Sequence, residues 1–161
     1  MPVTRDIVAT YGGPRRAIRR QLALGPREDR ALAVLMAGCV VVFIAQMPRL
    51  ARQAHLSGEE LNPLLGGTLL AWVFIAPLLL YALALVSHWV ARAFGGKGSP
   101  YGARIALFWA LLASAPLILL NGLVAGFIGP GPALTLVGGV WLAVFGWFWC
   151  SGLYEAEWGV S

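Results

Sequence analysis

Four long runs without a charged residue constrain this chain more than any other feature. They cover residues 31–47, 66–90, 105–128 and 133–153. The hydrocarbon core of a bilayer is about 30 Å thick and takes about 20 apolar residues of helix, within a range of about 17–25. The runs are continuous rather than alternating, which argues against a barrel, and backbone groups in hydrocarbon must bond within their own segment. We therefore expect an all-α, polytopic transmembrane helical bundle of about four spans.

The overall composition agrees with a single membrane domain. The chain has 161 residues, of which 59% are hydrophobic and 12% charged, whereas soluble domains are about 25% charged. This composition excludes a disordered chain, and the presence of only two cysteines, Cys39 and Cys150, excludes a disulfide scaffold. The predicted organisation is a cytoplasmic basic tail with a surface helix (1–30), a transmembrane domain (31–153) and a cytoplasmic C-terminal tail (154–161).

Proline and glycine mark the ends of the runs. Pro48 follows the first run, and Gly95 and Gly96 follow the second. The short link 129–132 predicts that the third and fourth spans are antiparallel neighbours. The third run could divide at Asn121-Gly122, but the remnant would be too short to cross, so we expect one whole span.

The flanking Lys and Arg residues predict the orientation of the spans. With four spans, the N-terminal tail and the link after the second span lie on one side. Only Arg49 and Arg52 flank the spans on the opposite side. We expect a multi-pass protein of the cell inner (cytoplasmic) membrane with both termini in the cytoplasm. The ten basic residues on the cytoplasmic side are Arg5, Arg15, Arg16, Arg19, Arg20, Arg27, Arg30, Arg92, Lys97 and Arg104.

Part of the basic tail has the pattern of a short amphipathic helix over residues 14–24, ending at Gly25-Pro26. Such a helix is suited to the inner membrane surface, where anionic headgroups attract basic side chains. A docking platform for a cytoplasmic protein partner is the alternative. Nucleic acid is not expected, because membrane orientation already explains the basic residues. The residues that would contact headgroups or a partner are Arg15, Arg16, Arg19 and Arg20.

The chemistry that the spans lack is informative. They contain no charged residue, which disfavours proton-coupled transport. His55 and His88 fall on opposite sides of the membrane and cannot share a haem, so His88 is expected at the interface or in a helix-to-helix hydrogen bond. No nucleophile has a base and an orienting group near it. We predict no catalytic, cofactor-binding or metal residues, and no enzyme.

Prolines and small residues within the spans point to packing. Pro77 and Pro116 each remove a backbone hydrogen bond and are expected to kink their helices. Gly122 and Gly126 are four residues apart, a spacing that allows close helix approach. Together with Asn121, Pro116 and Gly122 could instead form a polar, hinge-like pocket. Both interpretations remain open from the sequence.

Residues 94–116 resemble the core of the bacterial Yip-domain family, in which a Gly-rich basic link leads into a span with a small-residue and proline segment. The resemblance implies a polytopic, non-enzymatic membrane protein. Eukaryotic members bind small Rab-type GTPases and act in vesicle traffic, but their Rab-binding residues have no match here. The family is usually drawn with five spans, whereas four are counted in this chain. The matching positions are Gly95, Gly96, Lys97, Gly98, Tyr101, Arg104 and Pro116.

Three functions are consistent with these features. The first is a membrane scaffold or organiser that binds partners at its cytoplasmic face, as the basic tail and Gly-rich link suggest. The second is a small accessory subunit of a larger inner-membrane complex, as the small size and short loops suggest. The third is a small transporter that uses the kinked second and third spans.

Overall fold

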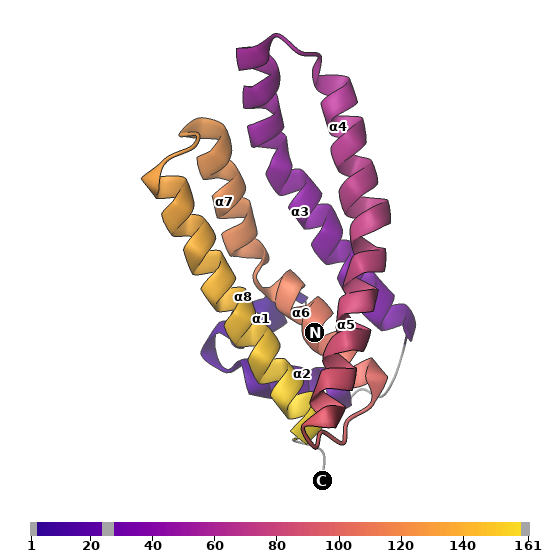
Figure 1. Cartoon of the computed structure of the whole chain (residues 1–161). Coiled ribbons are helices and arrows are strands. Elements are labelled where there is room, and N and C mark those ends of the chain that lie inside the picture. The colour runs from indigo at the N-terminus through magenta and orange to yellow at the C-terminus, as the bar shows by residue number, and fades with distance from the viewer. Residues whose placement is uncertain (1–2, 24–27, 159–161) are drawn as a thin grey trace.

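The computed structural model of this chain describes residues 3–23 and 28–158, and every regular element within them is a helix (Figure 1). The all-α class predicted from the sequence is therefore confirmed. In chain order the elements are α1 (Val3–Gly12), α2 (Pro14–Ala23), α3 (Glu28–Ser57), α4 (Leu61–Leu69), the π-helical turn η1 (Leu70–Ile75), α5 (Ala76–Ala93), α6 (Pro100–Ala113), α7 (Ala115–Phe127) and α8 (Pro132–Trp158).

Three of the described helices are long and apolar enough to cross a membrane by themselves. They are α3, the continuous helix Leu61–Ala93 made of α4, η1 and α5, and α8. The helices α6 and α7 form a pair bent by 46°, which makes a fourth span if the two are counted together. In Figure 1, α8, α7, α3 and α4 follow one another from left to right in the upper part of the bundle.

The first spanning helix continues well beyond its predicted end at Pro48. Helix α3 runs from Glu28 to Ser57 with Pro48 inside it. A proline costs one intrahelical hydrogen bond, but here the chain on either side keeps its helical path. The helix ends instead at Ser57 and is followed by Gly58, whose φ of 74° lies in the left-handed region that glycine adopts without steric cost. The link to α4 is therefore only three residues long.

The third predicted span, 105–128, is broken rather than whole. The break lies at Ser114, seven residues before the alternative division at Asn121. Pro116 has no N–H to donate to the carbonyl of Leu112, so the regular ladder fails at this turn. The Ser114 hydroxyl donates to the carbonyl of Leu111 at 2.9 Å and accepts the indole N–H of Trp141 at 3.2 Å. These bonds hold the bend in place.

The second predicted kink, at Pro77, also has a structural counterpart. A π-helical turn, η1, comes directly before it, and the N–H of Ala76 bonds to the carbonyl of Ala71. A π-helical turn contains one extra residue, so its backbone hydrogen bonds join residues five apart instead of four. The span nevertheless continues as one helix from Leu61 to Ala93.

Helix α6 forms the centre of the molecule. Its residues from Ile105 to Ala113 are all buried, between α2, α3, α5 and α8. Phe108 and Trp109 are among the largest fully buried side chains. The indole N–H of Trp109 donates to the Thr10 hydroxyl at 3.0 Å, which ties α1 to the core.

The two ends of the bundle differ in what they contain. Helix α2, the α5–α6 link and the end of α8 lie together at the lower end in Figure 1, whereas the α3–α4 and α7–α8 turns lie at the upper end. Helices α7 and α8 are antiparallel neighbours, as the short link between them predicted. We call the lower end, formed by residues 3–23, 88–104 and 147–158, the basic end.

Helix α8 extends past its predicted end at residue 153. It continues to Trp158, and Glu155, Ala156 and Glu157 within it are buried. The predicted C-terminal tail is thus helical over 154–158, while 159–161 lie outside the described residues. The same holds for Arg27 and for the predicted helix end at Gly25-Pro26.

Candidate functional site: the basic end

The predicted tail helix is present as α2, but it packs on protein. Its four arginines are exposed, while Ala17, Ile18 and Gln21 are buried against α6 and α8. Gly152 makes this approach possible, because a Cβ there would lie 2.9 Å from Ile18. The expectation of a helix whose apolar face enters lipid is therefore replaced by an intramolecular contact. The N-terminal helix α1, which lies before it, is not clearly basic and amphipathic.

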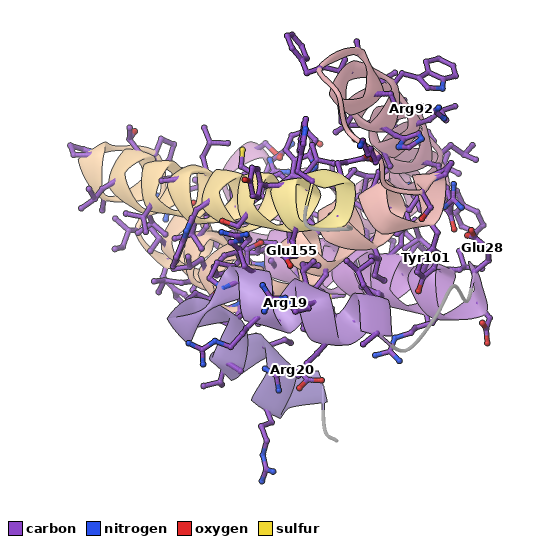
Figure 2. The ribbon with its side chains drawn as sticks, turned by 90° about the horizontal axis from the view of Figure 1, so that it is seen from below. Arg19, Arg20, Glu28, Arg92, Tyr101 and Glu155 are labelled. Atoms are coloured by element: carbon purple, nitrogen blue, oxygen red, sulfur yellow. The ribbon has the colours of Figure 1, made fainter. Side chains whose placement is uncertain are left out.

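Glu155 holds α2 in place through two arginines. The Arg15 Nε donates to Glu155 Oε2 at 3.0 Å, and the Arg19 Nε donates to Glu155 Oε1 at 2.8 Å. Figure 2 labels Arg19 and Glu155. The carboxylate is only 5% exposed, while both arginines are more than half exposed. The hydrogen bond that Arg19 donates to Glu155, followed by the negative charge of this carboxylate, raises the pKa of Arg19. A carboxylate near a helix C-terminus faces the negative end of the helix dipole, so these cations offset an unfavourable position.

The other two arginines of α2 point elsewhere. In Figure 2, Arg20 lies on the side of α2 away from α8, and its Nη1 is 3.8 Å from Asp6 Oδ1 on α1. Arg16 is exposed. Of the four arginines grouped by the sequence, Arg15 and Arg19 thus anchor the helix, while Arg16 and Arg20 make no contact with Glu155.

A second anchor joins the end of α8 to α5 and to the link that follows it. The His88 Nδ1 and Glu157 Oε1 are 2.5 Å apart, and both side chains are buried. The Gly98 N–H donates to Glu157 Oε2 at 3.1 Å, and the Lys97 N–H donates to the Glu157 carbonyl at 2.7 Å. Of the two positions expected for His88, the structure shows the helix-to-helix hydrogen bond.

The Gly-rich link is shaped by this contact with α8. A Cβ on Gly98 would lie 2.1 Å from the Ala156 carbonyl oxygen, so no larger residue fits without moving the backbone. Gly95 has a φ of 91°, and a Cβ on Gly96 would lie 2.9 Å from the Ala91 carbonyl oxygen. The exposed Lys97 side chain is left on the surface of the link.

The remaining residues of the family-like segment lie on or beside α6. Tyr101 is buried in the core, and its hydroxyl has no hydrogen-bond partner among the described residues. Arg104 forms an ion pair with Glu28 at the start of α3. Pro116 lies at the α6–α7 bend, about three helical turns further along the chain. The segment therefore joins the basic end to the bend without forming one cluster.

Gly122 and Gly126 lie at the contact between α7 and α3, away from the basic end. A Cβ on Gly122 would lie 2.0 Å from the Ala45 carbonyl oxygen, and one on Gly126 would lie 2.2 Å from the Pro48 Cβ. These glycines thus let two spanning helices meet backbone to backbone, as expected of residues four apart.

Asn121, on the same helix, lines a groove instead. The groove has a volume of ≈430 Å³ and lies between α3, α5, α7 and α8. Its wall includes Trp72, Trp141 and Phe145, of which the last two are stacked with ring centroids 5.4 Å apart. The Asn121 Oδ1 is buried and has no hydrogen-bond partner in the described structure. Of the two interpretations of this segment, close helix packing thus applies to Gly122 and Gly126, whereas the pocket applies to Asn121.

Glu155 and Glu157 organise the basic end but were not predicted from the sequence, because both were expected in a terminal tail. A signal was available. Two carboxylates directly follow a span on the side where ten basic residues gather. Residues two apart on a helix point in nearly opposite directions, so one carboxylate can face α2 while the other faces α5.

Comparison with known protein families, with curated proteins and with solved structures found no match for this chain. Within 3–23 and 28–158, no three His, Cys, Asp or Glu side chains gather in a way that could hold a metal ion. The basic end presents exposed arginines of α2, two of which bond to the buried Glu155 carboxylate of α8.

Proposed function

We propose that this chain is a non-enzymatic, Yip-type bacterial protein of the inner (cytoplasmic) membrane that acts as a scaffold or organiser. In this proposal it crosses the membrane several times, both termini lie in the cytoplasm, and partners bind at its cytoplasmic face. The observation that carries the proposal is the fixed position of α2. Glu155 bonds to Arg15 and Arg19, whereas Arg16 and Arg20 are exposed and do not bond to this carboxylate.

A docked helix is a better platform than a free tail for a physical reason. Binding to a flexible segment has to order its backbone and side chains, which reduces affinity. Helix α2 is already ordered against α6 and α8. A partner that binds its exposed arginines therefore does not have to order the backbone that carries them. The partner favoured by this surface is a protein with an acidic face, and the surrounding bilayer supplies anionic headgroups.

Affinity recovery from native membranes in mild detergent, followed by mass spectrometry, tests this proposal. Replacing both Arg16 and Arg20 by glutamine should reduce recovery of a soluble partner by up to about 30-fold, since each cation contributes roughly 1 kcal/mol near a charged surface. Arg49→Gln removes one exposed arginine from the opposite end and serves as the control. Equal recovery with all variants would remove the basis for a platform.

Glu155→Gln separates a fixed platform from simple charge attraction. This change removes a negative charge, so attraction alone predicts stronger recovery of an acidic partner. If the fixed position of α2 matters, recovery falls instead, because Arg15 and Arg19 lose their anchor. Size-exclusion chromatography of the variant checks that the bundle itself stays folded.

An accessory subunit of a larger inner-membrane complex is the alternative function. It is favoured by the long helix Leu61–Ala93, whose most apolar stretch is mostly exposed in the isolated chain. Leu78, Leu79 and Trp89 are among its exposed side chains. A stoichiometric set of membrane subunits recovered with the chain would support this alternative over the scaffold.

A small transporter is the third possibility, and the groove beside Asn121 is the feature that favours it. Purified protein in liposomes should then carry at least one solute of a test panel, and Asn121→Ala should lower that flux. Absence of flux for the whole panel would count against transport.

A further inference from the structure

A cavity of ≈340 Å³ opens between α2 and α8 at the basic end. Its wall combines three arginines of α2 with an aromatic and a hydroxyl side chain of α8, namely Arg15, Arg16, Arg19, Trp147 and Ser151. The cavity is thus a concave site in which cationic and apolar groups meet, and the contacts described above do not involve its α8 side chains, Trp147 and Ser151.

The cavity has a surplus of positive charge. Arg15 and Arg19 share the single carboxylate of Glu155, and Arg16 adds a third guanidinium. Guanidinium groups bind phosphate oxygens through planar, paired hydrogen bonds. Ser151 provides a hydroxyl on the opposite wall, which can donate to the same oxygens.

The cavity continues into an apolar surface along α8. Trp147 is 49% exposed, and Val140 and Leu136, which precede it by two and three helical turns on the same face, are 45% and 68% exposed. Tryptophan is enriched at the headgroup level of membranes, where its ring is apolar and its N–H is hydrated. A ligand that fills both parts must therefore have an anionic head and a hydrocarbon tail.

We propose that the cavity between α2 and α8 binds the phosphate headgroup of one anionic phospholipid, with its acyl chains lying along α8 beside Trp147 and Val140. The inference rests on the proposed function in one respect, namely that the basic end lies at the cytoplasmic face of the membrane. It differs from a general attraction of arginines to the surface, because it requires a specific site made by two helices. A soluble phosphate would satisfy the arginines but leave the apolar face without a role.

Native mass spectrometry of the detergent-solubilised full chain, titrated with phosphatidylglycerol or phosphatidylcholine, tests this site. We expect one phosphatidylglycerol to be retained in preference to phosphatidylcholine. Arg16→Gln should weaken that retention about fivefold or more, and Trp147→Ala should weaken it as well. Arg20→Gln is the matched control, since it removes the same charge from an exposed position of α2 that does not line the cavity.

Three outcomes would overturn the proposal. Equal losses for Arg16→Gln and Arg20→Gln would mean surface attraction without a site. Displacement of the lipid by inorganic phosphate at millimolar concentration would mean a soluble anion site. Displacement by an acidic peptide, with no preference between the two lipids, would mean that the cavity belongs to the partner surface. Lipid retention and partner recovery are separate readouts, so either can fail while the other holds.

Discussion

Glu157 joins three segments of the basic end through one buried residue. Its side chain meets His88 of α5 and the Gly98 N–H, and its carbonyl accepts the Lys97 N–H. Its side chain is 0% exposed. A buried carboxylate that loses a partner keeps its desolvation cost without the compensating bond, so we expect such changes to lower the stability of the whole bundle.

His88→Ala tests the contribution of this residue. It leaves Glu157 Oε1 without its nearest partner, and we expect the free energy of unfolding to fall by about 1–3 kcal/mol. Thermal unfolding of the purified protein in detergent measures the effect. His88→Gln keeps a donor at this position and should recover part of the loss.

The neighbouring Ser87→Ala is the control for His88→Ala. Its hydroxyl bonds only to the Ala84 carbonyl of its own helix among the contacts described, so the change should stay within about 0.5 kcal/mol. If the His88 and Ser87 variants unfold at the same temperature, the buried contact with Glu157 does not contribute to stability.

At the scale of the elements, the α3–α7 contact explains why α7 has to leave the direction of α6. Helix α6 is buried on all sides at the basic end, whereas α7 lies along α3 with glycines in the contact. The 46° bend at Ser114 connects these two environments. The bend is stabilised by Ser114 and Trp141, so it is part of the packing rather than a loose hinge.

Gly126→Ala tests this close packing. The added Cβ would lie 2.2 Å from the Pro48 Cβ, and overpacking of this kind costs about 1–3 kcal/mol in well-packed cores. We expect a lower unfolding temperature in detergent. Gly139→Ala on α8 is the matched control, because nothing lies within 4 Å of its added Cβ.

The two glycine variants should therefore change stability in different directions. In a helix, alanine is favoured over glycine by up to about 1 kcal/mol, so Gly139→Ala should be neutral or slightly stabilising. A Gly126→Ala variant as stable as Gly139→Ala would show that α3 and α7 are not in close contact.

At the scale of the whole molecule, the bundle has one strongly basic end and one nearly neutral end. The basic end contains α2, the α5–α6 link and the C-terminal turns of α8 (Figure 1). The opposite end has Arg49 and Arg52 near it, with Glu59 and Glu60 in or beside the turn that follows α3. By the distribution of Lys and Arg, the basic end should face the cytoplasm.

Cysteine labelling in intact cells tests this orientation. In a chain with Cys39→Ala and Cys150→Ala, we expect Glu59→Cys to react with a membrane-impermeant maleimide added from outside. Lys97→Cys should react only after the membrane is opened. Both positions are exposed, so accessibility within the protein does not limit either reaction. The reverse pattern would place the basic end outside the cell and contradict the proposed function.

The sequence by itself determined the all-helical class and the presence of helices long and apolar enough to span a membrane. It also predicted that the N-terminal tail and the link after the second span lie on the same side. These properties depend on the length of apolar runs and on charge in the flanks, which are local features of the chain. Pro116 and Gly95–Gly96 likewise marked a bend and a turn, because proline and glycine limit or free their own backbone. The sequence did not specify the contact that holds this bend, because the hydrogen bond from Trp141 to the Ser114 hydroxyl joins two different helices.

The tertiary structure alone decided which polar groups meet. Glu155 and Arg15 are 140 residues apart in the chain, and Glu157 and His88 are 69 residues apart. No local pattern specifies such pairs, because a hydrogen bond needs its two atoms within about 3 Å in space whatever their separation in sequence. For the same reason the arginines of α2 could be recognised as a basic face from the sequence. Which of them anchor the helix depends on where α8 ends and places Glu155.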